Sequence, residues 1–450
     1  MSTAPDAMTA SSPVLPYPKA SRGAYVVFIL MICWTFSFVD RAILSIIVDP
    51  VRQDLQLSEV QVGFVMGPAF AAFYIFFGLL MGHIADVRSR RNLIAFGVLA
   101  WSAATVACGL AVDFWSLSIA RMLVGAGEAA LGPAAYSLIP DYIRPKRIGT
   151  ALAVFSCGIT LGGGLALAGG GYIVEFASQS GLQGTILSGM AGWRVALLAF
   201  GIPGILVAGL LVLTVKEPVR RQAGKHLVPM SEFGRYLRSH ARLMSMASLG
   251  IAVAAVVPTT WVFWGPTFYI RAHGLSPQQA GLYFGFIQGV LSTIAALSGG
   301  YVRDLFVGRG NFEAPLLVVM GAMLLSTPML VISILMDYNL LSLSLFAVGA
   351  GISAAIAGMH GAAVIALFPG YLRGRASAIH IMIVSLVGMM VAPLFTAVLT
   401  EHVFRDDLQI GKSLAATCAA AGALSVLMLA ICLKPAHQHA RRIAEEAGEV

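Results

Sequence analysis

Long apolar runs separated by short polar or glycine- and proline-rich breaks are the dominant pattern of this chain of 450 residues. A helix of roughly 20 apolar residues crosses the ~30 Å hydrocarbon core of a bilayer. Twelve runs reach that length, at residues 24–48, 59–82, 92–112, 115–139, 149–176, 193–215, 243–270, 278–300, 314–336, 340–368, 374–400 and 412–433. The pattern predicts an all-α polytopic membrane protein with both chain ends on one side of the membrane.

The composition agrees with this prediction. Hydrophobic residues make up 58% of the chain and charged residues 11%, whereas about 25% of the residues of a soluble domain are charged. An ordinary soluble protein is therefore excluded. The first 22 residues are rich in Ala, Ser and Pro, so we expect residues 1–22 to form a disordered cytoplasmic tail and not a signal peptide.

The basic residues predict the orientation of the spans. Of the 29 Lys and Arg residues, 22 fall in the tails and loops on the side of the termini, five fall in the other loops, and Arg41 and Arg121 fall within spans. Loops rich in Lys and Arg stay cytoplasmic. We therefore expect both termini in the cytoplasm, in a bacterial inner membrane, and we interpret the net charge of +8 as a topology signal and not as a nucleic-acid-binding surface.

An internal repeat divides the chain. Leu57, Ser58, Gln61 and Gly63 recur as Leu275, Ser276, Gln279 and Gly281; Gly82 and Asp86 recur as Gly300 and Asp304; Pro140, Tyr142 and Arg144 recur as Pro369, Tyr371 and Arg373. We therefore expect two six-helix pseudo-repeats, at 23–215 and 243–434, joined by a cytoplasmic loop at 216–242 and followed by a cytoplasmic tail at 435–450. In such duplicated proteins the substrate site lies near the bilayer midplane, between the halves.

Two pairs of charged residues fall within apolar spans. Asp40 and Arg41 lie in the first span, and Arg121 and Glu128 lie in the fourth. Arg121 and Glu128 share a helix face about 10 Å apart along the axis. A charge at the bilayer centre costs at least ~2.5 kcal/mol, so these four residues are either structural ion pairs or a site for protons or substrate. We favour the second interpretation and expect them to meet in one cavity.

The segment after the second span resembles the signature loop of the major facilitator superfamily. The matching residues are Gly82, Asp86, Arg90 and Arg91, and the departures are Val87 and Ser89. The resemblance implies a twelve-helix transporter in which this loop latches one conformational state. We therefore expect a conformational gate in which the arginines can bridge to Asp141.

Three further motifs resemble the Spinster branch of that superfamily. They are Phe38, Val39, Asp40 and Arg41; Arg121, Gly125, Gly127 and Glu128; and Trp261, Trp264 and Pro266. This resemblance implies a lysophospholipid or sphingosine-1-phosphate as substrate. The motif from Arg121 to Glu128 also resembles organic-anion symporters of the same superfamily, so a proton-coupled symporter of hexuronates or aromatic acids is the alternative.

The charges are confined to the first half. Under the repeat, Asp40 and Arg41 correspond to Pro258 and Thr259, and Arg121 and Glu128 correspond to Ala350 and Ala357. The second half instead offers Trp261, Phe263, Trp264, Phe268, Tyr269, Met359 and His360. Any one of the aromatic residues taken alone is as typical of packing or lipid contact as of a cavity wall. Together they predict a cavity that is ionic on one side and apolar on the other, which suits an amphiphile.

The sequence thus predicts a secondary active transporter that moves a lysolipid-like amphiphile by alternating access. Arg41 and Arg121 would hold an anionic head group, and Asp40 and Glu128 would carry protons. An enzyme or receptor is disfavoured, because the sequence shows no metal-binding cluster and no nucleophile–base pair. The expected partners are the substrate, protons and the bilayer, without metal or cofactor other than the proton gradient and without nucleic acid, and we expect a monomer.

Overall fold

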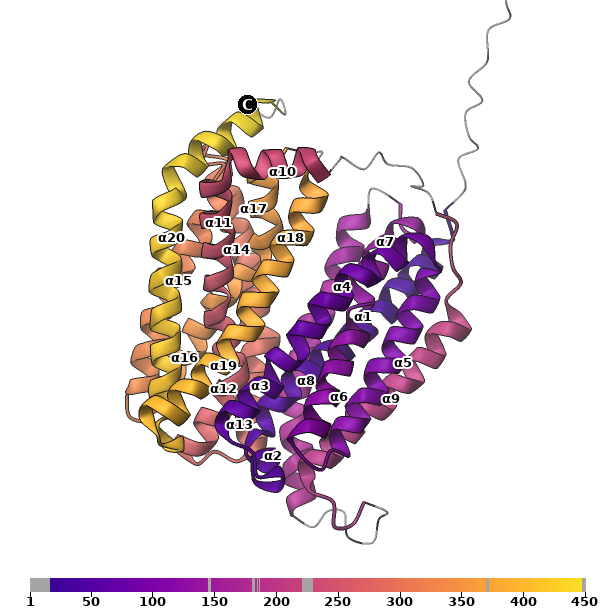
Figure 1. Cartoon of the computed structure of the whole chain (residues 1–450), viewed down its shortest axis with the longest axis vertical. Helices are drawn as coiled ribbons and strands as arrows, with labels where there is room; N and C mark the ends of the chain where they lie inside the picture. The colour runs from indigo at the N-terminus through magenta and orange to yellow at the C-terminus, as the bar shows by residue number, and fades with distance from the viewer. Residues whose placement is uncertain are drawn as a thin grey trace, which may run out of the picture.

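The computed structural model describes residues 17–144, 147–179, 183, 185, 187–220, 230–369 and 372–446. Within these residues the regular structure is entirely helical. The helices form two bundles that stand side by side, one from each half of the chain (Figure 1).

The first bundle contains the first six spans. Its elements are α1 Ala20–Ala42, η1 Ile43–Ile46, α2 Val48–Leu55, α3 Glu59–Met66, α4 Pro68–Val87, α5 Arg90–Gly109, α6 Phe114–Glu128, α7 Leu131–Tyr142, α8 Ile148–Ser178 and α9 Gly192–Thr214.

The second bundle contains the last six spans, preceded by a short helix. Its elements are α10 Met230–Ser239, α11 Ala241–Ala254, α12 Val256–His273, α13 Pro277–Phe286, η3 Ile287–Leu291, α14 Ser292–Val307, α15 Ala314–Leu335, α16 Leu340–Ser353, η4 Ala354–Gly358, α17 Met359–Leu367, α18 Arg373–Leu386, η5 Val387–Val391, α19 Ala392–Val398, η6 Leu399–Phe404, η7 Asp407–Gln409 and α20 Ile410–Glu446.

Twelve helical segments are long and apolar enough to cross a membrane, which confirms the predicted spans. Three boundaries differ from the expectations. α1 begins at Ala20, inside the expected tail; α10 forms within the expected loop 216–242; and α20 continues to Glu446. The helix passes through Pro435 because Ala436, His439 and Ala440 give it a buried face at helical spacing.

The repeated motif that begins at Leu57 has the same structural role in both halves. Ser58 caps α3 and Ser276 caps α13, each in a capping box with the glutamine three residues later. A Cβ atom at Gly63 would collide with Pro393 and Ala397 of α19, and a Cβ atom at Gly281 would collide with Leu167 of α8. Each glycine therefore lets a helix of one bundle pack closely against the other bundle.

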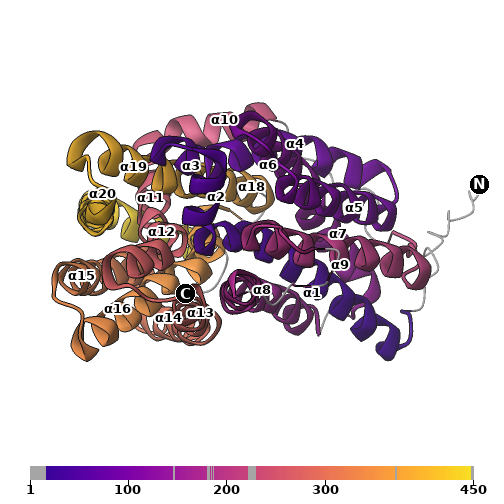
Figure 2. The ribbon, with the colours of Figure 1, turned by 90° about the horizontal axis from the view of Figure 1, so that it is seen from below.

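The two bundles meet at one end and lean apart at the other, as Figure 1 shows. They meet around α2, α3 and α13, and diverge towards the end where α10 and the C-terminus lie. Seen along the long axis, α8 lies next to α13 and α14 at the boundary between the bundles (Figure 2). We call the end that carries the termini the inner end and the opposite one the outer end.

Candidate functional site

The four charged residues predicted from the sequence lie together in the first bundle. Arg41 on α1 donates through Nε to Oε2 of Glu128 on α6, at 2.7 Å. The hydroxyl of Ser37, one turn before Arg41, donates to the same oxygen at 2.6 Å. Residues four apart lie on one helix face, so α1 presents both donors to Glu128, whose side chain is fully buried.

Aromatic rings surround the Arg41 guanidinium. Its central carbon lies 4.8 Å from the ring centre of Phe38, 5.0 Å from that of Phe70 and 4.6 Å from that of Tyr74. Cation–π attraction is strongest where a cation is desolvated. Arg41 can therefore keep its place when its ion pair with Glu128 opens.

Arg121 and Asp40 lie beside this pair, but their side chains do not pair with each other in this structure. Arg121 donates through Nη1 to the backbone carbonyl of Asp40 at 3.0 Å, and both residues are buried. Within the described part of the chain, Oδ1 of Asp40, Nε of Arg121 and Oε1 of Glu128 have no hydrogen-bond partner. A buried polar atom without a partner raises the free energy of the folded protein. A proton or a ligand that binds to these atoms would lower it.

The predicted apolar residues are packed inside the second bundle. Trp261 donates to the hydroxyl of Ser353 and Trp264 to the carbonyl of Pro393, each at 3.0 Å. The buried side chains also include Phe268, Tyr269 and Met359. In this conformation these side chains pack against the rest of the second bundle. That they contact the substrate stays a prediction. The side chain of His360 lies outside the described part of the structure.

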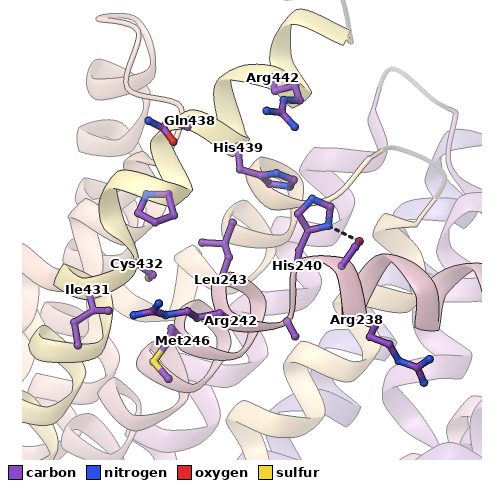
Figure 3. A pocket seen from close by; sticks show the side chains of 13 residues that line it. Arg238, His240, Arg242, Leu243, Met246, Ile431, Cys432, Gln438, His439 and Arg442 are labelled. Atoms are coloured by element: carbon purple, nitrogen blue, oxygen red, sulfur yellow. Dashed lines mark hydrogen bonds between the residues drawn. The ribbon is translucent and has the colours of Figure 1, made fainter.

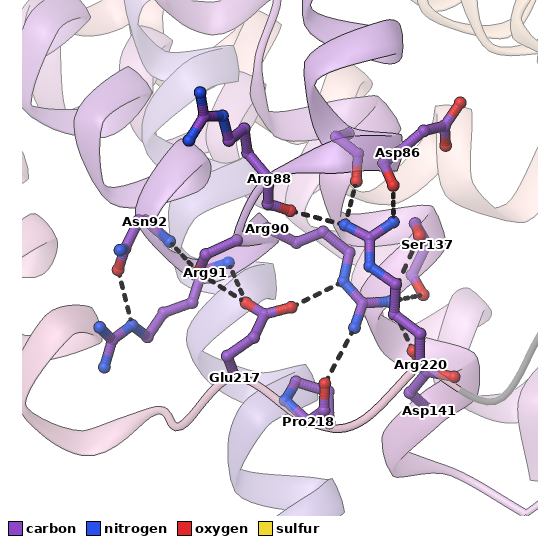
Figure 4. Close-up of polar contacts among 12 residues, drawn as sticks. Asp86, Arg88, Arg90, Arg91, Asn92, Ser137, Asp141, Glu217, Pro218 and Arg220 are labelled. Atoms are coloured by element: carbon purple, nitrogen blue, oxygen red, sulfur yellow. Dashed lines mark hydrogen bonds and ion pairs between the residues drawn. The ribbon is translucent and has the colours of Figure 1, made fainter. Parts of the chain in front are cut away.

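The predicted gate forms a network at the inner end of the first bundle (Figure 4). Arg90 donates to Asp141 at 2.5 Å and to the carbonyl of Ser137 at 3.0 Å, so the predicted bridge to Asp141 is present. Glu217 accepts from the side chain of Arg90 and from the backbone N–H of Arg91, both at 2.8 Å. The network ties α5 to α7 and to the segment that leaves α9.

Glu217 was not identified from the sequence as part of this network. Burial alone would raise its pKa, but the hydrogen bonds from the Arg91 N–H, Arg90 and Ser89 outweigh burial and hold the pKa below its ordinary value. Glu217 follows Lys216 in a loop where the sequence analysis considered only the basic residues.

Among the described residues, the Asp86 side chain and Gly82 make none of the expected latch contacts in this conformation. The Asp86 side chain is exposed, and Figure 4 shows its carboxylate pointing away from the network. Its backbone carbonyl accepts from Arg220, which also donates to the carbonyls of Ala85 and Arg88. A Cβ at Gly82 would meet nothing within 4 Å. As far as the described residues show, the network stays within the first bundle and does not link the inner ends of the two bundles.

A second network closes the outer end, and it does join the bundles. Arg271 on α12 lies 2.5 Å from Asp49 and 2.6 Å from Glu59. Arg52 lies 2.8 Å from Glu59 and 2.5 Å from Asp407 of the second bundle. The side chain of Glu59 is 1% exposed, so it is a buried acid shared by two arginines.

Other polar contacts between the bundles lie at the same end. The backbone N–H of Val60 donates to Glu401 at 2.7 Å, and that of Gln278 donates to Glu175 at 3.1 Å. The sequence analysis used the charges of these loops only to orient the spans, because which acid meets which base depends on how the two halves dock. The structure is therefore closed at the outer end.

Comparisons with known proteins match this chain to membrane transporters. The family model described as the Major Facilitator Superfamily matches residues 30–393. An MFS-type efflux pump of Mycolicibacterium smegmatis is 26% identical over 432 residues, which cover 95% of each chain. The probable galactarate/D-glucarate transporter GudP of Bacillus subtilis is 28% identical over 350 residues, which cover 70% of this chain and 72% of GudP.

A solved structure is similar along nearly the whole chain. It is the crystal structure of a bacterial homologue of the human lysosomal transporter Spinster, in an inward-facing and unoccupied conformation. It superimposes with a TM-score of 0.77 at 25% sequence identity, and the match covers 95% of this chain and 99% of that chain.

Proposed function

The chain belongs to the major facilitator superfamily of secondary transporters, and on that premise we propose that it carries a lysolipid- or sphingolipid-like amphiphile across the membrane by proton-coupled alternating access. Members of this superfamily are transporters and not enzymes. With its twelve spans the chain is a multi-pass membrane protein.

The ion pair between Arg41 and Glu128 carries the proposal. A carboxylate held by an arginine among aromatic rings can exchange that partner for a proton. Once Glu128 is protonated, Arg41 is free to bind the anionic head group of a substrate. Asp40 would bind a second proton and Arg121 would also bind the head group, since each has a buried polar atom without a partner among the described residues. Proton and substrate then favour the same state, which is the thermodynamic requirement for coupling.

The asymmetry between the halves supports an amphiphile. The charges lie in the first bundle, while Trp261, Trp264 and Met359 give the second bundle a buried apolar interior in the corresponding region. We propose that this interior contributes apolar contacts to the substrate, from Trp261, Trp264, Phe268, Tyr269 and Met359, when the bundles rock. We also propose that His360, the residue after Met359, binds the substrate.

The two networks supply the gates in this mechanism. The outer network around Arg271 and Glu59 is closed here, and the inner network around Arg90 stays within one bundle. The similarity to an inward-facing Spinster homologue supports an inward-facing state. We propose that Gly82, Asp86, Arg90, Arg91 and Asp141 latch the inner end in the opposite state.

The topology follows from the distribution of basic residues. We propose that both termini lie in the cytoplasm of a bacterial cell, with the protein in the inner membrane, because 22 of the 29 Lys and Arg residues fall on the terminal side. We further propose a monomer with six-helix units at 23–215 and 243–434, joined at 216–242.

A small organic anion is the second candidate substrate. The similarity to the probable galactarate/D-glucarate transporter favours it, as does the Arg121 to Glu128 motif. A small dianion would be held by Arg41 and Arg121 alone and would need no apolar interior.

Ligand binding to the purified protein separates the two candidates. Each buried methylene contributes ~0.8 kcal/mol, so lysolipid affinity is expected to rise about fourfold per added methylene until the apolar interior is filled. The measurement is the shift in thermal unfolding with a lysophosphatidylglycerol series, using galactarate as the comparison. Affinity that does not depend on chain length, together with a shift from galactarate, would replace the amphiphile by an organic anion.

A further inference from the structure

A cavity outside the transport site lies at the inner end of the second bundle, where α10, α11 and α20 meet (Figure 3). Its volume is about 590 Å³, within the range of ~300–1,000 Å³ that is typical of small-ligand pockets. α10 and α11 follow one another in the sequence, whereas α20 lies more than 150 residues further on, so the tertiary fold brings the walls of the cavity together.

The side chains that line this cavity are of two kinds, basic and apolar. The basic residues that line it are Arg238, His240, Arg242, His439 and Arg442. The apolar residues that line it include Leu243, Met246, Ile431 and Cys432. None of the described residues that line it is an acid. Figure 3 shows Arg442, His439 and His240 above Ile431 and Met246, with Arg242 next to Met246.

Two of the arginines that line the cavity have no acceptor among the described residues. Within the described part of the chain, the guanidinium groups of Arg242 and Arg442 make no hydrogen bond or ion pair. By contrast, the neighbouring Arg441 pairs with Glu445 at 2.9 Å. The first turn of α11 also opens here, and its N-cap residue His240 makes no side-chain capping bond. Uncapped helix N-termini favour anions.

The two histidines hold this end of the cavity in shape. Their ring centres lie 4.6 Å apart, and the hydroxyl of Tyr236 lies 2.8 Å from Nε2 of His439. Tyr236 also donates to the carbonyl of Leu367 at 2.9 Å. α10 is thereby fixed against α17 and α20, and His240 and His439 lie side by side at this end of the cavity.

We propose that this cavity binds the head group of an anionic phospholipid from the leaflet on the inner side. The phosphate would lie beside Arg442 and the N-terminus of α11, Arg242 would donate to the ester carbonyls below it, and an acyl chain would lie along Leu243, Met246 and Ile431. From Ile431 to Arg442 the helix rises roughly 16 Å, which spans the ~5–8 Å head-group layer and the first part of the acyl region.

The apolar end distinguishes a lipid from free phosphate. Inorganic phosphate gains nothing from Leu243, Met246 and Ile431, whereas an acyl chain gains free energy for each buried methylene. Basic pockets between membrane-spanning helices are where anionic lipids bind. This site is separate from the one around Arg41, so it does not depend on which substrate is carried.

The test is a titration of the full-length protein in neutral detergent, followed by native mass spectrometry. The probes are diacyl phosphatidylglycerol, diacyl phosphatidylcholine and inorganic phosphate. The double variant Arg242→Gln/Arg442→Gln is expected to bind phosphatidylglycerol about thirtyfold more weakly, because each arginine contributes to attraction of an anionic lipid. Arg441→Gln is the matched control and is expected to bind like the wild type. The exchanged residues are exposed, so the fold is retained.

Three outcomes would overturn the proposal. Equal phosphatidylglycerol affinity in the wild type and the double variant would exclude the two arginines as ligands. Phosphatidylcholine binding as tightly as phosphatidylglycerol would remove the role of negative charge. Inorganic phosphate binding as tightly as the lipid would reduce the cavity to a simple anion site. All three leave the proposed transport function unaffected.

Discussion

Arg271 lies 2.6 Å from Glu59 and thereby joins the second bundle to the first at the outer end. Arg271 is 7% exposed and Glu59 is 1% exposed, so this is a buried ion pair. Removing one partner of such a pair costs roughly 3–5 kcal/mol. The pair links the two bundles only where they meet, so this cost falls on the conformation with a closed outer end.

The first prediction concerns this outer gate. Arg271→Gln is expected to shift the population towards a form open at the outer end, because the lost contacts stabilise only one conformation. The measurement is the distance between spin labels at Gln53 and His402, which are exposed at the outer end. Arg194→Gln is the control, since Arg194 pairs with Asp54 within the first bundle. A variant with the same distance distribution as the wild type would show that the outer network is not a gate.

The second prediction concerns the inner gate. The Asp86 carboxylate is exposed here, so Asp86→Asn removes nothing from this conformation and weakens only the state in which the inner ends meet. We expect a shift towards the conformation described here. Labels at the inner ends of α4 and α18 measure it. An unchanged distribution, or a shift to a shorter distance, would contradict a latch at Asp86.

The third prediction is a pH dependence of stability. The pKa of Glu217 is lowered in the folded protein, so its contribution to stability is complete above the unfolded value of ~4.3 and is lost as the pH falls through the folded value. Glu217→Gln is therefore expected to lower the melting temperature at neutral pH but not in acid.

Thermal unfolding of wild type and variant from pH 7 to pH 3 measures this effect. Glu232→Gln, on α10, is the control for a change of an acid elsewhere. A difference between Glu217→Gln and wild type that persists unchanged to pH 3 would show that the ionised carboxylate is not what stabilises the network.

Much of this architecture could be predicted because it depends on local pattern. Apolar length alone identifies the spans, and the capping boxes at Ser58 and Ser276 are local motifs that a repeat search detects. The clustering of Asp40, Arg41, Arg121 and Glu128 was also predictable, since isolated charges in a membrane need partners. Which side chains pair could not be predicted, because the sequence does not show that Arg121 donates to the backbone carbonyl of Asp40.

The parts that were missed depend on long-range packing. α20 continues past Lys434 and Pro435, where hydropathy falls, because the apolar face that includes Ala440 is buried against the rest of the bundle. Glu59 and Arg271 are ordinary loop-end charges in sequence, and only the docking of the two halves makes them partners.

Gradient-driven transport by Glu128→Gln tests the central proposal most directly. The assay is uptake or release of labelled lysophosphatidylglycerol by proteoliposomes with and without an imposed pH gradient, with Glu232→Gln as the control. Because a glutamine cannot exchange Arg41 for a proton, the account predicts that the variant binds substrate but no longer responds to the gradient, while the control responds like the wild type. Asp40→Asn is expected to lose the response as well. If both Glu128→Gln and Asp40→Asn keep the gradient-driven rate of the wild type, the buried charges are structural and the proposed coupling is wrong.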